Sequence, residues 1–131
     1  MNLLTKEQIL SATDYKTEDV PVPEWGGTAR VRTISGRERD AFEASLSVGS
    51  GTARKVNTDN IRARLVAMCV IDEAGARLFS DSEVLKLGEK SATALDRVFT
   101  VAQRLNALSQ AEVEDIAKNS EAAPSGASTS A

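Results

Sequence analysis

Few side chains in this sequence are of the types that catalysis or metal binding needs. The 131 residues include no histidine and one cysteine, Cys69. Without histidine there can be no Ser-His-Asp or Cys-His relay, no His-ligated metal and no imidazole that titrates near neutral pH. Cys69 alone cannot close an intramolecular disulfide or build a thiolate zinc site, and its apolar surroundings are typical of a small core residue. We therefore expect no catalytic residue, no cofactor and no metal.

Two further segments have some features of ligand-binding loops. Residues 72–75 read Asp-Glu-Ala-Gly, but they lack the alternating oxygen ligands of a calcium loop, so we interpret them as a polar hairpin turn. Residues 49–52 read Gly-Ser-Gly-Thr with Lys55 nearby. They do not match the Gly-x-x-x-x-Gly-Lys-Ser/Thr phosphate loop, and no strand is expected before them. We interpret this segment as a flexible linker.

Basic residues are concentrated in the middle of the chain. Residues 28–64 carry eight basic and four acidic side chains, whereas residues 1–27 and 65–131 have net charges of −3 and −4. The eight basic residues are Arg30, Arg32, Arg37, Arg39, Arg54, Lys55, Arg62 and Arg64.

This basic segment has three interpretations. Clustered cations attract nucleic-acid phosphates, and they can also bring the basic middle of one copy to the acidic end of the next. Alternatively they form a solvated face, because Glu38, Asp40 and Glu43 are interleaved with the arginines. A pI near 5.0 opposes DNA binding, so no nucleic-acid partner is expected. A protein-facing role and a solvated face both remain open.

The elements that position the first arginines are a hairpin and two capped helices. Residues 17–34 predict a β-hairpin with its turn at two glycines, and prolines make its first arm an edge strand. Arg30 and Arg32 then share one face of the second arm, and Trp25 at the tip either anchors a partner or covers a small core. Capping-box spacing predicts one helix over residues 4–10, with an apolar side, and another after Ser35.

The rest of the chain predicts more short elements. Thr58 or Asp59 is expected to cap a helix running to Cys69. Residues 70–79 predict a second small hairpin, followed by a short helix. Residues 91–108 repeat apolar side chains at three- and four-residue steps and predict the principal core helix.

The fold class that follows is α+β, mainly α-helical, with small β-hairpins packed against several helices. Aromatic residues are only 4% of the chain, so the core must be aliphatic. Residues 1–118 form the predicted domain, and capping-box spacing after position 109 suggests a short acidic helix. Residues 119–131 lack Leu, Ile, Val and aromatic side chains, so they cannot offset an ordering entropy of roughly 1–2 kcal/mol per residue. They are expected to be a disordered Ala/Ser-rich tail.

Two features argue against a membrane protein or an exported one. No apolar run approaches the roughly 20 residues needed to span a bilayer. The first residues lack the basic region and apolar core of a signal peptide. We expect no membrane partner.

Short sequence motifs occur through most of the chain in a characteristic order. They occupy residues 3–10, 22–27, 30–32, 35–40, 42–43, 71–75 and 79–80. In this order and spacing they resemble the small tail assembly chaperones of long-tailed, HK97-like bacteriophages.

The resemblance implies a non-catalytic protein of the host cell cytoplasm. Such a protein binds the tape measure protein, keeps it soluble, helps recruit the major tail tube protein and is absent from the mature virion. Many members are also made as a longer product by ribosomal frameshifting. A chaperone for a long helical client needs repeated weak contacts, so we expect self-association, head to tail or in a spiral.

We hypothesise that this role uses the basic hairpin, its tip and the helix that follows. The predicted protein interface comprises Trp25, Arg30, Arg32, Arg37 and Arg39. Two other functions remain alternatives: a small nucleic-acid-binding phage regulator that uses residues 28–64, and a minor structural tail-completion protein.

Overall fold

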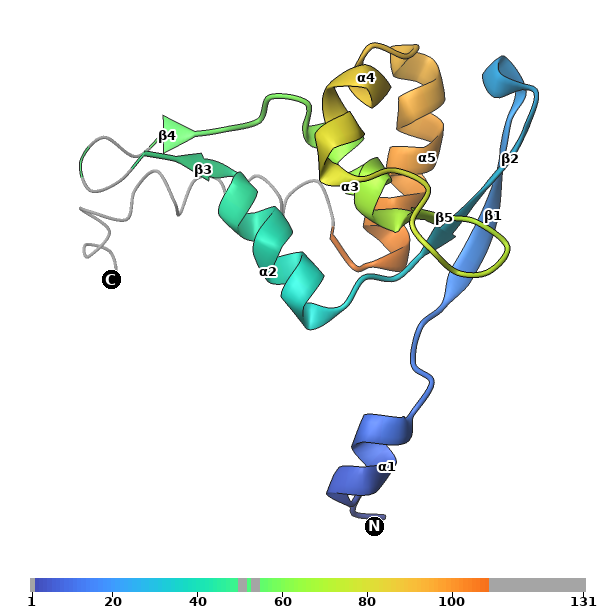
Figure 1. Cartoon of the computed structure of the whole chain (residues 1–131), viewed down its shortest axis with the longest axis vertical. Coiled ribbons are helices and arrows are strands. Elements are labelled where there is room, and N and C mark those ends of the chain that lie inside the picture. The colour runs from blue at the N-terminus through green and yellow to red at the C-terminus, as the bar shows by residue number, and fades with distance from the viewer. Residues whose placement is uncertain (1, 50–51, 53–54, 109–131) are drawn as a thin grey trace.

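Short helices alternate with short strands in the part of the chain that the structure describes, residues 2–49, 52 and 55–108 of a computed structural model (Figure 1). The α+β, mainly helical fold predicted from the sequence is confirmed. The elements are α1 (Lys6–Ser11), β1 (Thr17–Val22), η1 (Pro23–Trp25), β2 (Gly27–Arg32), α2 (Gly36–Ser45), β3 (Ser47–Val48), β4 (Lys55–Val56), α3 (Ile61–Cys69), β5 (Val70–Ile71), η3 (Asp81–Glu83), α4 (Val84–Gly88) and α5 (Ala92–Leu105).

The predicted first hairpin forms the main sheet. β1 and β2 are antiparallel, from Thr17 opposite Arg32 to Val22 opposite Gly27. β5 pairs with the other side of β2, so the order is β1-β2-β5 and β1 is an edge strand, as its prolines predicted. The turn runs through η1 and closes at Gly26, whose φ of 74° is the left-handed conformation that glycine adopts without strain.

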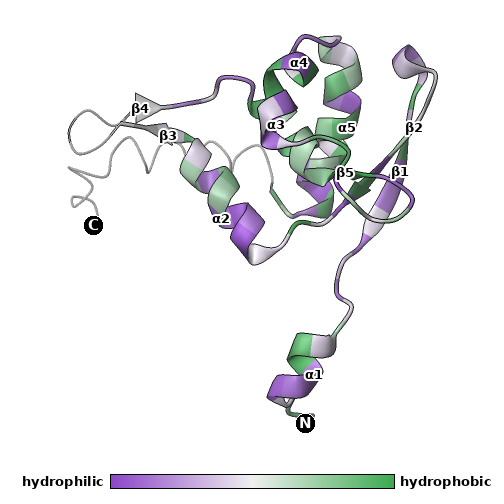
Figure 2. Ribbon diagram, viewed as in Figure 1, coloured by the Kyte–Doolittle hydropathy of each residue, from purple (hydrophilic) through white to green (hydrophobic). Residues whose placement is uncertain are grey.

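The core lies between this sheet and two helices. α5 packs against α3 and against β1 and β2, and it buries one face, which includes Leu95, Val98 and Phe99. α3 buries Ala63, Leu65, Val66, Ala67 and Cys69, whereas Arg62 on its outer side stays exposed. Figure 2 shows hydrophobic stretches on both helices, interrupted by hydrophilic ones. The expected role of the 91–108 segment as the principal core helix agrees with this packing.

Two local predictions are wrong in detail, and a third is confirmed in a short form. Neither Thr58 nor Asp59 caps α3, because the chain enters the helix through Asn60 in the left-handed conformation (φ 53°). The predicted second hairpin is present in a short form: Ile71 and Arg77 form an antiparallel bridge, flanked by backbone hydrogen bonds from Asp72 to Ala76 at 2.8 Å and from Leu78 to Val70 at 3.1 Å, and β5 also pairs with β2. A strand does precede the glycine-rich segment, because β3 pairs with β4 on its far side.

Two observations bound the fold. No helix of the described part is long and apolar enough to cross a membrane. The domain end at 118, the acidic helix after 109 and the tail at 119–131 all fall beyond the described residues, so these three stay predictions.

Candidate interaction surface

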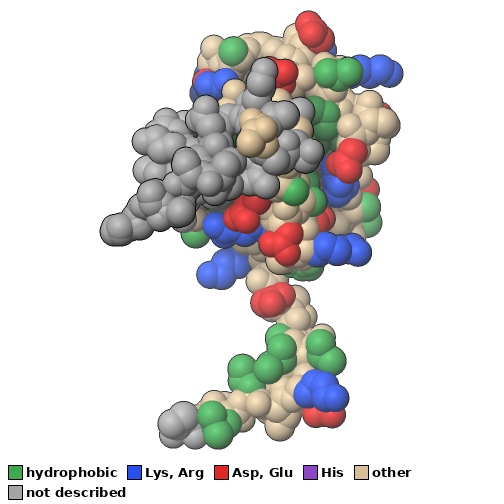
Figure 3. All heavy atoms as spheres, turned by 90° about the vertical axis from the view of Figure 1, so that its left-hand side faces the viewer, with side chains coloured by type: hydrophobic (Ala, Val, Ile, Leu, Met, Phe, Trp, Pro, Cys, Tyr) green, Lys and Arg blue, Asp and Glu red, His purple; other side chains and the backbone are tan. Residues whose placement is uncertain are grey.

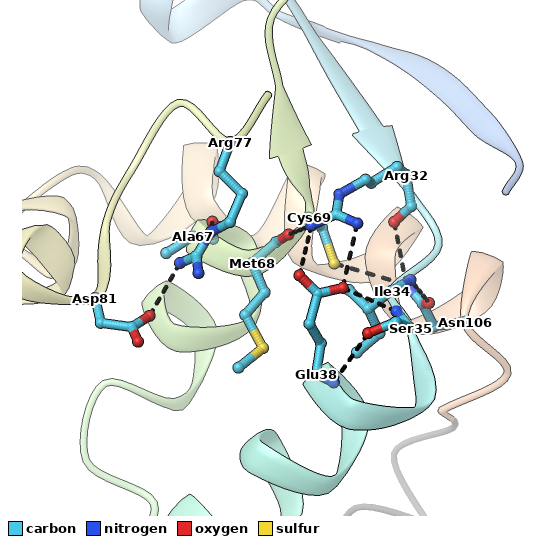
Figure 4. A network of polar contacts seen from close by, with 10 residues as sticks. All are labelled: Arg32, Ile34, Ser35, Glu38, Ala67, Met68, Cys69, Arg77, Asp81 and Asn106. Carbon is cyan, nitrogen blue, oxygen red and sulfur yellow. Dashed lines mark hydrogen bonds and ion pairs between the residues drawn. The ribbon is translucent and has the colours of Figure 1, made fainter. Parts of the chain in front are cut away.

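Arg32, a predicted interface residue, is held inside the domain (Figure 4). Its guanidinium donates two hydrogen bonds to the Glu38 carboxylate, at 3.2 and 2.7 Å, and one to the Met68 carbonyl at 3.2 Å. The ring of Tyr15 covers the guanidinium, with its centre 5.6 Å away. Only 11% of the Arg32 side chain is exposed. Arg32 therefore joins β2, α2 and the end of α3.

Glu38 completes this junction from the first turn of α2. One of its carboxylate oxygens accepts a hydrogen bond from the Ser35 backbone N–H at 2.8 Å, and the Ser35 hydroxyl accepts one from the Glu38 N–H at 3.1 Å. Burial raises the pKa of Glu38, but the hydrogen bonds from Arg32 and Ser35 outweigh it and hold that pKa below its ordinary value. The capping box predicted here is confirmed.

Asn106 fixes the end of α5 to the same region. Its side-chain oxygen accepts a hydrogen bond from the Ile34 N–H at 2.8 Å, and its amide donates to the Ala102 carbonyl at 3.0 Å. Arg39 donates to the Asn106 carbonyl at 3.4 Å. No pattern in the sequence marked Asn106, because its partners Ile34 and Arg39 lie far away along the chain.

Two arginines also cap the C-terminal end of α3, which has no basic residue of its own in the last turn. Arg32 reaches the Met68 carbonyl, and Arg77 donates to the Ala67 carbonyl at 3.1 Å, as Figure 4 shows. Cations placed at a helix C-terminus stabilise its exposed carbonyls. Arg32 and Arg77 therefore stabilise the folded domain at this helix end.

The remaining predicted arginines lie at the surface. Arg30 pairs with Asp19 directly across the hairpin at 2.8 Å, and Arg39 pairs with Glu43 one turn along α2 at 3.3 Å. Arg37 is exposed in the first turn of α2 and forms no ion pair with any residue in the described ranges. Arg30, Arg32 and Arg39 thus have their charges balanced within the fold, and the protein-facing and solvated interpretations of this segment both stay open.

Acidic residues of β1 and the turn hold the hairpin to α5. Glu18 accepts a hydrogen bond from Arg104 at 2.6 Å, and Glu24 binds Arg97 at 2.8 Å. Each carboxylate has a pKa lowered mainly by the hydrogen bond from its arginine. Both pairs face solvent, so each adds little to stability and serves mainly to fix the hairpin against the helix.

Metal-ligating and nucleophilic side chains are scarce among the described residues. No group of three carboxylate or thiol side chains there could hold a metal ion. Burial raises the pKa of the Cys69 thiol to about 12, so at neutral pH it stays protonated and unreactive.

Apolar side chains are exposed in three places. They lie on the N-terminal arm (Leu3, Leu4, Ile9, Leu10 and Tyr15), beside the hairpin tip (Trp25 and Leu78) and on α4 (Leu85). Trp25 and Leu78 edge a groove of about 190 Å³ whose floor includes Val22, Val66 and Val70. Trp25 is therefore partly buried, with 39% of its surface exposed, and it lies at the rim of this apolar groove.

Comparison with known proteins identifies the family. The model of a phage tail assembly chaperone family matches residues 5–119. The chain belongs to this family. A solved structure, described as that of the bacteriophage HK97 tail assembly chaperone, superposes with a TM-score of 0.54 at 19% sequence identity, over 76% of this chain and 90% of that one. No curated protein matches the chain.

The family match spans α1 and every later element of the described part, which is the region that carried the resemblance in the sequence. At 19% identity the HK97 structure shows a shared fold. Neither comparison assigns contact residues, so the interface at Trp25, Arg30, Arg32, Arg37 and Arg39 stays a prediction.

Proposed function

We propose that this chain acts in the host cell cytoplasm as a tail assembly chaperone that binds the tape measure protein. It keeps that protein soluble, promotes polymerisation of the major tail tube protein around it and is absent from the mature virion. The observation that carries the proposal is the family match over residues 5–119. The surface supports a binding role, because apolar side chains are exposed on the N-terminal arm and beside the hairpin tip.

The roles of the predicted interface residues differ. Arg32 positions the junction of β2, α2 and α3 from inside, since its side chain is 11% exposed. Arg30, Arg37 and Arg39 lie at the surface beside it, and Arg37 has its charge unmatched within the described ranges. We assign the direct contact with an acidic or apolar protein surface to Arg37 and its neighbours.

A longer product belongs to the same proposal. Ribosomal frameshifting near the end of the gene would replace or extend the segment after residue 118. The shared domain would then bind the client in both products.

Co-expression with the tape measure protein of the same phage tests the proposal. The fraction of tape measure protein in the soluble extract should rise several-fold when this chain is present, and the two should co-purify. Arg37→Glu should reduce both, and it should leave folding intact because an acid in the first turn of a helix is favourable. Lys90→Glu, an equal charge change at another exposed position, is the control and should have no effect. An insoluble tape measure protein in the presence of folded chain would overturn the proposal.

A further inference from the structure

A second groove, of about 420 Å³, lies in the body of the domain. α2 and α4 each pack on α3, so α3 forms the floor of this groove, which we call the α2–α4 groove. It is lined from α2 by Ala41 and Ser45, from α3 by Arg64 and Met68, and from α4 by Val84 and Leu85. The exposed apolar residues of the N-terminal arm are not part of it, and Figure 3 shows that arm projecting from the body with hydrophobic side chains along it.

Apolar side chains along the α2–α4 groove stay accessible. Leu85 is 73% exposed, Ala41 is exposed, and Met68 and Val84 are half-buried. Figure 4 shows the Met68 side chain turning away from the polar network that its carbonyl joins. A methionine side chain is flexible and adapts to apolar partners of irregular shape. A ligand in this groove would therefore bury apolar surface that the domain itself leaves open.

The α2 wall of the groove begins with an arginine whose charge is unmatched. Residues four positions apart lie about 40° apart around a helix, so Arg37 shares the face of Ala41 and Ser45, one turn earlier. Arg37 forms no ion pair with any residue in the described ranges. Positive charge is thus available at this end of the groove.

A second arginine lies at the other end of the same wall. Arg64 donates hydrogen bonds to the Ser45 carbonyl at 2.6 Å, to the Ser45 hydroxyl at 2.7 Å and to the Asn57 carbonyl at 2.8 Å. Its Nε is buried and has no acceptor among the described residues. Burial lowers the pKa of Arg64, although Asp59 nearby favours the charged form. Neutral oxygens thus hold this cation, and a carboxylate would match it better.

The groove also contains two acids, which limit where a carboxylate can bind. Asp81 lines it but is paired with Arg77 at 3.0 Å. Asp59 lies near Arg64 without forming an ion pair in the described part of the chain. The positive charge open to a ligand therefore follows α2, and a complementary ligand places its carboxylates on that side.

The helices around the groove favour a helical ligand. From Arg37 to Ser45 the α2 wall spans about 12 Å, or about two helical turns. The backbone groups of such walls are bonded within their own helices, so they offer no strand edge to an extended peptide. A helix satisfies its own backbone and requires apolar contact from the groove, which it makes through side chains three or four positions apart.

We propose that an amphipathic, acidic helix of the tape measure protein docks in the α2–α4 groove. Its apolar side chains contact Met68, Val84 and Leu85, and its carboxylates face Arg37 and Arg64. This docking rests on the proposed function, because it takes the tape measure protein as the client. It joins the contact at Arg37 to a defined apolar site.

The acidic segment of the chain itself is a less suitable occupant. Residues 109–118, which lie outside the described residues, combine three acids with a valine and an isoleucine. Asn106 is bonded to Arg39 on α2, and Arg39 lies about 200° around that helix from Arg37. Asn106 is therefore on the side of α2 away from the groove. A segment that starts there would have to cross α2 to enter it.

Position-specific crosslinking in the complex of the full chain with the tape measure protein tests the proposal. The Cys69 thiol is buried and stays protonated, so a benzophenone maleimide attaches only to an introduced cysteine. Ala41→Cys, in the groove wall, should crosslink to the tape measure protein. Thr100→Cys, exposed on α5 outside the groove, should give several-fold less. The captured tape measure peptide should carry apolar residues three or four positions apart beside an acid.

Retention of the tape measure protein on immobilised full chain, over a dilution series, gives the energetic test. Leu85→Asp should weaken binding at least about tenfold, because a carboxylate replaces an apolar contact and repels the acidic helix. Leu85→Met keeps the apolar contact and should bind nearly as well as the wild type. Thr100→Asp introduces the same charge outside the groove and should have no effect. Both positions are exposed, so these variants should melt like the wild type.

The outcomes separate the docking site from the function. A tape measure protein that does not bind the wild-type chain would contradict the proposed function itself. Normal binding by Leu85→Asp would overturn the docking site alone. So would crosslinks from position 41 that lead to a second copy, or to residues 109–118 of the chain, instead of the tape measure protein.

Discussion

The pair between Arg32 and Glu38 is the residue-scale centre of the fold. It joins the end of β2, the first turn of α2 and the last carbonyls of α3 through side chains that are only 11% and 22% exposed. A charge pair of this kind gains from bidentate geometry and from the extra hydrogen bonds that satisfy its remaining oxygens. Replacing either residue leaves the charge of the other partly desolvated and without its partner.

Replacement of Glu38 tests this junction. Glu38→Gln should lower the free energy of unfolding by about 1–3 kcal/mol, because hydrogen bonds to a charged group are lost. The measurement is denaturant unfolding at about pH 7. Glu43→Gln, which breaks the exposed pair with Arg39, is the control and should cost about 0.5 kcal/mol or less.

The same residue gives a pH dependence with a defined sign. The pKa of Glu38 is lower in the folded state than its ordinary value of 4.5. Its contribution is therefore complete above that value and is lost as the pH falls through the folded-state pKa. Glu38→Gln should thus destabilise the protein less at acidic pH than at neutral pH. An equal effect at both would contradict the assigned pair.

The ion pairs of individual arginines show why the sequence predicted only part of the site. Counting charges located the basic segment, and two of the interleaved acids, Glu38 and Glu43, do pair with its arginines. The pairing of Arg97 with Glu24 and Arg104 with Glu18 spans more than 70 residues, so no local spacing predicts it. For the same reason the burial of Arg32 was not foreseen.

At the scale of elements, the sequence predicted where capped helices begin. It did not predict a helix that begins after a residue in an unusual backbone conformation. The capping boxes at Thr5 and Ser35 act over three residues, so the sequence alone displays them. The left-handed Asn60 before α3 and the pairing of β5 with β2 depend on how distant parts pack. The local hairpin signal of residues 70–79 correctly predicted the bridge between Ile71 and Arg77, but it gave no sign of the further pairing of β5 with β2.

The core role of α5 has a direct test. Leu95 is 5% exposed in the face that packs on α3 and the sheet. Leu95→Asp should unfold the domain or destabilise it by several kcal/mol, because a charge without a partner is driven into the core. Leu85→Asp, the same change at an exposed leucine, should melt within a degree or two of the wild type. Circular dichroism melting compares them, and equal melting of both variants would remove α5 from the core.

At the scale of the whole molecule, a packed body carries a separate apolar arm and an apolar groove. The sequence predicted the helix of the arm and its apolar side. It did not show that this side stays exposed, since exposure depends on where every other element lies. A body stabilised by its own core, with exposed apolar side chains on the arm and beside the groove, fits the membership of the chain in the tail assembly chaperone family.

A role in tail assembly is tested most directly in the phage itself. An early stop codon in this gene removes both the short product and any frameshifted one. Electron micrographs of the resulting lysate should show filled heads without tails, and a plasmid copy of the gene should restore tails. Normal numbers of full-length tails in the absence of the protein would contradict its assignment to tail assembly.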